Sequence, residues 1–216
     1  MVIENKSPMN ESFLVFSVQS SVYAIRSSHV VELIWLPELT CLESNSFFVV
    51  GYFNFRSDFV PVIDLNLRQG MKTKRYSVSD RILVITEGTK KIGLHINDIH
   101  NVIHFTYEKQ NIIDEIVSDR ITEGVIQTQF GITQVINIEA LTNLNIALNE
   151  SKRVKPFSDI HLAKLFGGIN EKDKQILISR KNNYSQSTNI KEYSNLLSVV
   201  VFRLKDEFLA IELKYI

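Results

Sequence analysis

Three histidines near the middle of the chain, His95, His100 and His104, are of a type that could bind a metal ion. On a helix the last two would share a face at a spacing of four, which suits zinc ligands. Residues 93–105 alternate and are rich in β-branched side chains, however, which predicts a strand. On a strand the same two histidines lie about 13 Å apart. We therefore expect ordinary buried or exposed histidines, with no metal site and no cofactor.

Nucleophilic catalysis has little support in the sequence. Cys41 is the only cysteine, which excludes an intrachain disulfide and a cysteine-based zinc site. The chain contains none of the patterns GxSxG, GxxxxGK, GxGxxG and CxxC, which mark common enzyme sites. Catalysis by scattered residues stays open, but we expect a protein that is not an enzyme.

Glu32 and Arg56 are the charged residues most suited to act as a pair. Each stands at the edge of an apolar stretch, where a lone buried charge is costly and a partner relieves the cost. In one interpretation the pair fixes a turn at residues 51–57 and presents Arg56 to a binding partner. In the other it is a surface ion pair worth about 0–1 kcal/mol without a partner role.

Four further residues have types that shape the backbone. Asn54 suits a tight turn because it tolerates a left-handed conformation, and Gly51 marks a close approach or a positive φ. Pro61 lies early in a strand, which predicts an edge strand or a bulge. Asp64 can cap a helical turn at residues 65–67. For all four, turn and cap chemistry is as good an explanation as contact with a partner.

Composition limits the classes of partner. The 216 residues carry 24 basic and 24 acidic side chains, and the net charge of zero argues against a dedicated nucleic-acid or membrane-surface binder. No apolar run approaches the roughly 20 residues that span a bilayer. The N-terminus also lacks the basic and apolar regions of a signal peptide. We expect a cytoplasmic protein that does not insert into the membrane.

Hydrophobic periodicity predicts an all-β fold. Residues 13–18 and 22–25 form a hairpin pattern around a polar turn, and a short helix is expected at residues 29–34 after a serine cap. Further apolar runs recur every 8 to 12 residues or so, as in a sandwich or barrel. They cover residues 47–55, 59–63, 81–86, 91–96, 99–103, 121–127 and 132–136. A final helix is expected at residues 138–144, capped by Asn137.

The chain changes character near residue 145. Residues 1–144 carry 12 basic and 16 acidic side chains, a balance of −4, whereas residues 145–197 carry 9 and 5, a balance of +4. We interpret residues 147–197 as a partly helical, polar, mobile linker. Residues 198–216 then repeat the first hairpin at an offset of 186, with four identities. An isolated hairpin of this length is marginal in water, so we expect it to be loose unless it pairs with a sheet edge.

Several segments, in order, resemble the CheW-like domains that couple chemoreceptors to the histidine kinase CheA. The resemblance covers residues 11–146, and residues 198–216 look like the start of a second, incomplete CheW-like domain. The segments are Tyr23-Ala-Ile, Val30-Val-Glu-Leu, Gly51-Tyr-Phe-Asn-Phe-Arg, Val60-Pro-Val-Ile-Asp-Leu, Ile82-Leu-Val-Ile and Gly93-Leu-His-Ile. The chain departs from the family at Phe55, where leucine is usual, at Ser57, where glycine is usual, and at Ile96-Asn97, where Val-Asp is usual. Ser57 adopts a positive φ less readily than glycine.

The resemblance implies a fold of two intertwined SH3-like five-stranded β-barrels with short helices. It also implies a non-enzymatic adaptor at membrane-associated receptor arrays, whose partners are a CheA-type histidine kinase and the cytoplasmic tip of a methyl-accepting chemoreceptor. The residues expected to bind these partners are Glu32, Gly51, Asn54, Arg56, Val102 and Ile103, the last two forming an apolar patch for the kinase. Pro61, Asp64 and Gly93 are expected to be structural.

One alternative from another class stays open. An all-β barrel can also bind a small ligand or an oligonucleotide, as OB-like folds do. The acidic balance of residues 1–144 disfavours nucleic acid, and no basic stripe interleaves there with aromatic residues. The adaptor therefore remains the first hypothesis.

Overall fold

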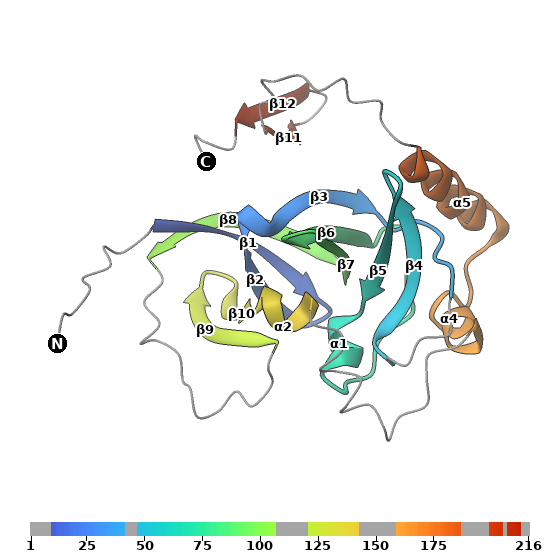
Figure 1. Cartoon of the computed structure of the whole chain (residues 1–216), viewed down its shortest axis with the longest axis horizontal. Coiled ribbons are helices and arrows are strands. Elements are labelled where there is room, and N and C mark those ends of the chain that lie inside the picture. The colour runs from blue at the N-terminus through green and yellow to red at the C-terminus, as the bar shows by residue number, and fades with distance from the viewer. Residues whose placement is uncertain are drawn as a thin grey trace.

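The computed structural model describes residues 10–41, 47–106, 121–142, 159–186, 199–204 and 207–212, in which strands predominate (Figure 1). Ten strands form two five-stranded sheets, which confirms the all-β prediction. In pairing order, the first sheet holds β8 (Asp98–Thr106), β1 (Asn10–Val18), β2 (Ser21–Arg26), β10 (Gly131–Ile136) and β9 (Thr122–Thr128). The second holds β3 (Val30–Trp35), β6 (Arg81–Glu87), β7 (Lys90–Ile96), β5 (Asp58–Ile63) and β4 (Val49–Phe55). The helices are α1 (Leu65–Arg68), α2 (Ile138–Thr142), α4 (Asp159–Leu165) and α5 (Glu171–Ser185).

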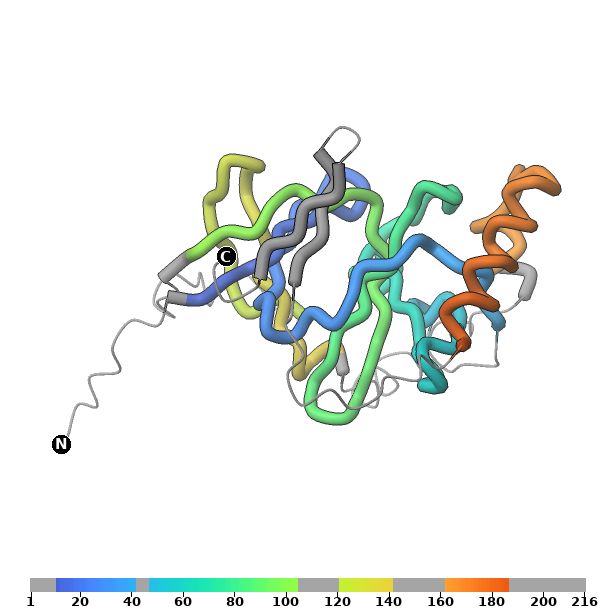
Figure 2. The backbone as a smooth tube through the Cα atoms, turned by 90° about the horizontal axis from the view of Figure 1, so that it is seen from above, coloured from blue at the N-terminus to red at the C-terminus, as the bar shows by residue number. Residues whose placement is uncertain are grey.

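The two sheets form intertwined SH3-like barrels. The chain runs from β1 and β2 in the first sheet through β3 to β7 in the second, then returns to the first with β8, β9 and β10 (Figure 2). The largest cluster of buried apolar side chains draws on both sheets. Its members include Phe16, Tyr23 and Ile25 from the first, and Ile63, Leu83 and Leu94 from the second. Because the barrels share this core, they form one folded unit.

The helix expected at residues 29–34 is wrong. Only Ser27–His29 form a single 3₁₀ turn, without a side-chain cap, and Val30–Trp35 is strand β3. This strand is rich in β-branched residues and pairs antiparallel with β6. The pairing with a neighbouring strand overrides the short helical pattern that the apolar residues also permit.

Both predicted helix caps are confirmed: the carboxylate of Asp64 and the carboxamide of Asn137. Oδ1 of Asp64 accepts hydrogen bonds from the backbone N–H groups of Asn66 and Leu67, at 2.8 and 3.1 Å, and so begins α1. Oδ1 of Asn137 accepts from the N–H of Ala140 at 3.1 Å and begins α2. In each case the side chain satisfies an N–H that has no partner within its helix.

Of the edge strand or bulge predicted at Pro61, the edge strand is wrong, whereas the pairing of β4 and β5 does contain a register shift close to it, between Val49 and Gly51. Strand β5 lies between β4 and β7 in the second sheet. Pro61 faces Tyr52 of β4, whereas the pairing of β5 with β7 begins only at Val62, opposite Gly93. The missing N–H of proline therefore falls just before the part of the strand where both sides are paired.

Two glycines are required by close packing. A Cβ atom on Gly93 would lie 2.7 Å from Cγ2 of Ile82, in the middle of the second sheet. A Cβ atom on Gly51 would lie 2.9 Å from Cβ of Leu39, where the backbone of Thr40 bridges to β4 and helps to close the barrel. The predicted close approach at Gly51 is thus confirmed.

The segment expected to be a mobile linker includes two helices that pack on the second barrel (Figures 1 and 2). Leu177 of α5 is 4% exposed and belongs to the core of that barrel, and its carbonyl accepts a hydrogen bond of 3.0 Å from the N–H of Glu38. Nζ of Lys181 lies 2.8 Å from the carboxylate of Glu38. The prediction of a polar, partly helical stretch is right about the helices, but residues 159–186 belong to the folded unit because apolar side chains scattered among the polar ones reach the core.

Strands β11 (Val199–Leu204) and β12 (Glu207–Glu212) form a separate hairpin. In the first hairpin Val15 pairs with Ala24, and in the last Val201 pairs with Ala210, so the two registers agree at the offset of 186. This agreement supports the internal repeat that the sequence indicates. The start of a second domain at residue 198, and its looseness, stay predictions.

Replacing Gly93 with Ala should lower the free energy of unfolding by about 1–3 kcal/mol, because the added methyl group overpacks the sheet against Ile82. Urea unfolding followed by circular dichroism measures the change. Thr89→Ala, an exposed turn residue, is the control and should shift stability by less than about 0.5 kcal/mol. Equal stability of Gly93→Ala and wild type would contradict the packing described.

Candidate functional site

The predicted pair of Glu32 and Arg56 is present as an ion pair. Nη2 of Arg56 donates to Oε2 of Glu32, and the guanidinium also lies 4.9 Å from the ring centre of Phe55. Glu32 comes from β3 and Arg56 from the turn after β4, so the pair links the two edge strands of the second sheet. Both side chains are more than a third exposed, so the pair contributes about 0–1 kcal/mol to stability. Its main effect is to orient a charged group at the surface.

The turn that carries Arg56 has an uncommon backbone. Arg56 and Ser57 have φ values of 49° and 72°, and they form the two-residue loop between Phe55 and Asp58, which pair with each other. Two successive left-handed residues define a type I′ hairpin turn, which usually contains glycine or asparagine. Each residue other than glycine costs about 1–2 kcal/mol in this conformation. Ser57 thus keeps the positive φ that the family glycine would provide.

Asn54 does not lie in this turn, contrary to the prediction. It is an extended residue of β4, opposite Phe59 of β5, and its side chain is exposed. Alternation along β4 places Asn54 on the same face as Tyr52. The ring of Tyr52 stacks on that of Phe59, with centres 4.9 Å apart and planes 5° apart. Phe59 is 54% exposed, so an aromatic pair lies open on the surface beside Asn54.

A second exposed apolar strip follows the edge strand β3. Val31, Leu33 and Trp35 alternate along the strand and are 36%, 39% and 44% exposed. The Trp35 ring lies 4.5 Å from the guanidinium of Arg81 and 5.4 Å from that of Arg180. Exposed apolar strips of this kind often mark interaction sites. The strip was not predicted because residues 30–35 are almost all apolar and were placed on a helix, so the exposed face of the strand could not be told from its buried one.

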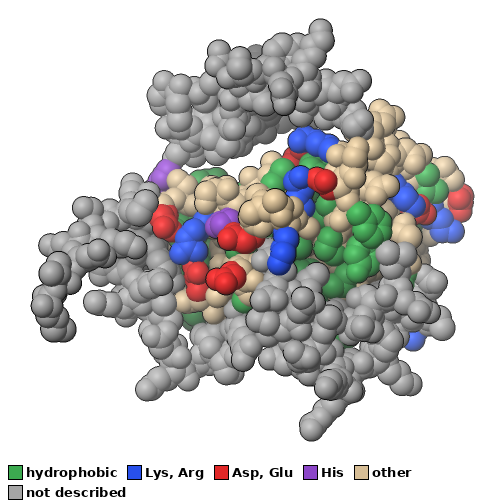
Figure 3. Space-filling view, in the orientation of Figure 1, with side chains coloured by type: hydrophobic (Ala, Val, Ile, Leu, Met, Phe, Trp, Pro, Cys, Tyr) green, Lys and Arg blue, Asp and Glu red, His purple; other side chains and the backbone are tan. Residues whose placement is uncertain are grey.

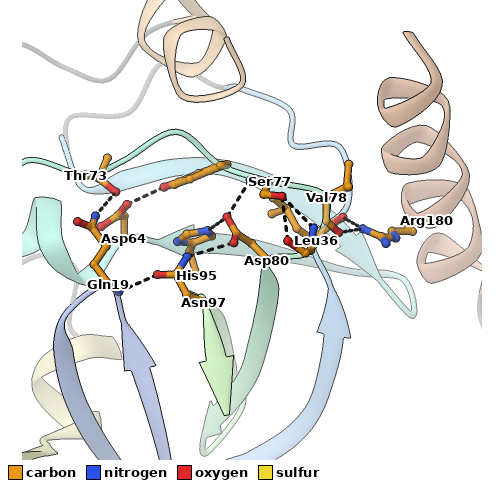
Figure 4. A network of polar contacts seen from close by, with 12 residues as sticks. Gln19, Leu36, Asp64, Thr73, Ser77, Val78, Asp80, His95, Asn97 and Arg180 are labelled. Atoms are coloured by element: carbon orange, nitrogen blue, oxygen red, sulfur yellow. Dashed lines mark hydrogen bonds and ion pairs between the residues drawn. The ribbon is translucent and has the colours of Figure 1, made fainter. Parts of the chain in front are cut away.

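A buried polar network joins the second barrel to the first (Figure 4). Nε2 of His95 lies 3.0 Å from Oδ2 of Asp80, whose other oxygen accepts a hydrogen bond of 3.1 Å from Nδ2 of Asn97. Oδ1 of Asn97 in turn accepts from the N–H of Gln19, at 2.7 Å, in the turn between β1 and β2. A chain of hydrogen bonds therefore runs from the second sheet to a turn of the first.

The same network includes a buried tyrosine. The hydroxyl of Tyr76 donates to Oδ2 of Asp64 at 2.7 Å, and its ring stacks on His95 with centres 3.8 Å apart. Burial, together with the charge of Asp64, raises the pKa of Tyr76 well above its ordinary value. Burial by itself raises the pKa of Asp80, but the hydrogen bond and charge of His95, with further hydrogen bonds from Ser77 and Asn97, outweigh it and lower that pKa.

All three histidines lie on strands, as predicted: His95 on β7, and His100 and His104 on β8. His95 is 3% exposed within the network, His100 stacks on Phe130 with centres 4.6 Å apart, and Nδ1 of His104 lies 3.1 Å from Oγ of Ser12. Within the described ranges no group of three or more His, Cys, Asp or Glu side chains could hold a metal ion. In the same ranges no helix is long and apolar enough to cross a membrane.

Val102 and Ile103, nominated for an apolar patch, are both half-buried in β8. Ile103 packs against a small cluster of buried residues in the first barrel, which includes Phe13 and Val15. These two residues therefore offer less exposed apolar surface than the strip on β3 or the aromatic pair of β4 and β5. The structure does not bring them into contact with Glu32 or Arg56 in any described interaction.

Two small barrels that share a core, and that expose apolar strips beside a rigid charged turn, are the features of a protein-interaction module. A family model described as CheW-like domain matches residues 12–145. The chain therefore belongs to the CheW-like domain family.

Two curated relatives are named chemotaxis protein CheW. The protein from Helicobacter pylori is 23% identical over 131 residues, which cover 60% of this chain and 79% of that protein. The protein from Klebsiella aerogenes is 24% identical over 101 residues, which cover 47% of this chain and 61% of that protein, less than two thirds of its length. The crystal structure of the scaffolding protein TtCheW from Thermoanaerobacter tengcongensis matches with a TM-score of 0.53 and 24% identity, over 64% of this chain and 91% of that one. This likeness supports the double-barrel fold.

Replacing Asp80 with Asn should lower the free energy of unfolding at pH 7 by about 1–3 kcal/mol, because His95 and Asn97 lose a buried charged acceptor. The pKa of Asp80 is lowered on folding, so its stabilisation is complete above about pH 4 and is lost as the pH falls through the folded-state pKa. The difference between variant and wild type should therefore shrink only below about pH 4.

Urea unfolding at pH 7, 5, 4 and 3 measures this difference. Asp98→Asn is a matched control, since Asp98 is exposed and pairs with Arg81 at the surface. It should change stability by less than about 0.5 kcal/mol. A difference for Asp80→Asn that is already lost at pH 5 would contradict the lowered pKa.

Proposed function

We propose that the chain is a non-enzymatic adaptor that couples chemoreceptors to a CheA-type histidine kinase in chemotaxis signalling. It acts in the cytoplasm and is recruited to membrane-associated receptor arrays. Its membership of the CheW-like family supports this proposal, and so do the names of its relatives. The observation that carries it is the Glu32–Arg56 pair, held at the surface by a turn of fixed geometry at the positions of the family motif.

The receptor contact is assigned to the surface around this pair. Arg56 supplies a planar donor that can bind a carboxylate in two places, and Glu32 holds it in one orientation. Gly51 and Asn54 belong to β4, the strand that leads into the turn. Asn54 lies beside Tyr52 and Phe59, so it belongs with the candidate kinase contact. The apolar strip on β3 alternates with Glu32, so the strip and the charged pair lie on the two faces of one edge strand. A helical receptor tip that packs along this edge could contact the strip with its apolar face and reach Arg56 with a carboxylate.

The kinase contact has two candidate positions. Val102 and Ile103 are the first, although both are half-buried. Tyr52 and Phe59 are the second, and Figure 3 shows hydrophobic side chains gathered over β4 and β5 among Lys and Arg side chains. Exposed aromatic residues are the commonest anchors of protein interfaces. We therefore propose that the aromatic pair carries more of the kinase contact than the pair on β8.

Coupling needs no chemistry beyond binding. A rigid double barrel that binds receptor and kinase together raises their effective concentration and fixes their relative orientation. The shared core and the buried polar network supply the rigidity.

Replacing Arg56 with Ala should weaken binding to a receptor cytoplasmic fragment by about tenfold, with an unchanged circular dichroism spectrum, because the exposed pair contributes little to stability. Isothermal titration calorimetry measures the affinity. Lys72→Ala removes an exposed positive charge elsewhere and is the control. Loss of folding in Arg56→Ala would show the residue to be structural instead.

Replacing Phe59 with Ala should weaken binding to the regulatory domain of a CheA-type kinase by about tenfold or more, because a large exposed aromatic anchor is removed. Val102→Ala is the matched comparison and should cost less than about threefold. A pull-down followed by titration measures both. The assignment of the kinase surface is wrong if the two effects are reversed, and the adaptor proposal fails if the wild-type chain binds no kinase domain at micromolar concentration.

A further inference from the structure

Helix α5 lies outside residues 12–145, the part of the chain that matches the family, yet it contacts the turn that carries Arg56. The backbone N–H of Arg56 donates a hydrogen bond of 2.8 Å to the carbonyl oxygen of Tyr184, in the last turn of α5. The last four carbonyls of a helix have no partner within the helix. The N–H at the start of a two-residue hairpin turn is likewise not used by the strand ladder. The helix end and the turn therefore satisfy each other.

Electrostatics favour the same contact. The C-terminal end of a helix carries a partial negative charge, which stabilises a nearby cation. The backbone N–H of Arg56, the positive end of a peptide dipole, lies against this end of the helix. The helix dipole therefore favours the hydrogen bond between Arg56 and Tyr184.

The position of α5 is fixed by contacts that do not involve Arg56. Leu177 is buried in the core of the second barrel. Nη1 of Arg180 donates to two backbone carbonyls, those of Leu36 at 3.0 Å and Val78 at 2.7 Å. These bonds attach the middle of the helix to the segments that follow β3 and precede β6 (Figure 4). Contacts elsewhere on α5 therefore hold the end of the helix against the turn that carries Arg56.

The turn has a specific need for such support. Arg56 and Ser57 both have positive φ values, and neither is a glycine. A glycine at position 57 would adopt this conformation without steric strain. The turn of this chain depends on external contacts more than a turn with glycine would.

We propose that α5 is a positioning element for the Arg56–Ser57 turn, and that Ser57 makes the chain dependent on it. The helix holds the turn in the conformation that presents Arg56 to its partner, and Arg180, together with Leu177, sets the helix in place. Only the part of this inference that concerns binding of a partner rests on the proposed function. The effect on the turn itself does not depend on any partner.

The test uses Arg180→Ala in the full chain, with amide hydrogen exchange read by NMR. The N–H of Arg56 should exchange at least about tenfold faster, because the turn opens locally when the helix loosens. The N–H of Leu94, in the centre of the second sheet, should keep its wild-type rate. Lys172→Ala, an exposed charge on the same helix, is the control and should change neither rate.

Rescue separates positioning from a direct contact of Arg180 with the partner. Arg180→Ala should weaken binding to the receptor fragment about fivefold, and Ser57→Gly added to it should restore affinity to within about twofold of wild type. An unrescued loss of affinity would overturn the proposal, as would an unchanged Arg56 exchange rate. Equal acceleration at Leu94 would also overturn it, since α5 would then be a general stabiliser. If the wild-type chain binds no receptor fragment, the proposed function fails, and the exchange rates still decide the role of α5.

Discussion

The arrangement of the two barrels is constrained by a buried polar network centred on Asp80. Asp80 precedes β6 of the second sheet, and its oxygens bind His95 and Asn97, which in turn holds Gln19 of the first sheet. Buried polar groups are costly when unpaired, so an arrangement that keeps the hydrogen bonds of Asp80 and Asn97 is favoured over one that breaks them. The shared apolar core provides most of the attraction between the barrels, and the polar network selects one arrangement among those that bury a similar area.

This constraint matters because an adaptor acts through geometry. The charged turn with Arg56, the strip on β3 and the aromatic pair of Tyr52 and Phe59 all lie on the second barrel, whereas Val102 and Ile103 belong to the first. The position of Val102 and Ile103 relative to the other surfaces depends on how the two barrels are joined. The network, the shared core and helix α5 thus contribute to the same property, which is a rigid set of surfaces for more than one partner.

Much of the fold could be predicted from the sequence because alternation and cap chemistry are local. The apolar runs gave nearly all strands, and Asp64 and Asn137 cap the helices expected of them. Strand β3 was missed because its short pattern fits a helix until its pairing with β6 is known. The ion pair of Glu32 and Arg56 was predicted from the cost of lone charges and confirmed, while the partners of that surface stay proposals. The docking of α5 and the role of His95 depend on contacts between residues far apart in the chain, for which one sequence holds no local signal.

An adaptor of this kind must bind receptor and kinase at the same time. Sedimentation velocity of the full chain with a receptor cytoplasmic fragment and a kinase regulatory domain measures this directly. We expect a single faster-sedimenting complex that contains all three proteins and that loses the receptor fragment when Arg56 is replaced with Ala. Mutual displacement of the two partners, or sedimentation of this chain by itself in their presence, would contradict the adaptor proposal.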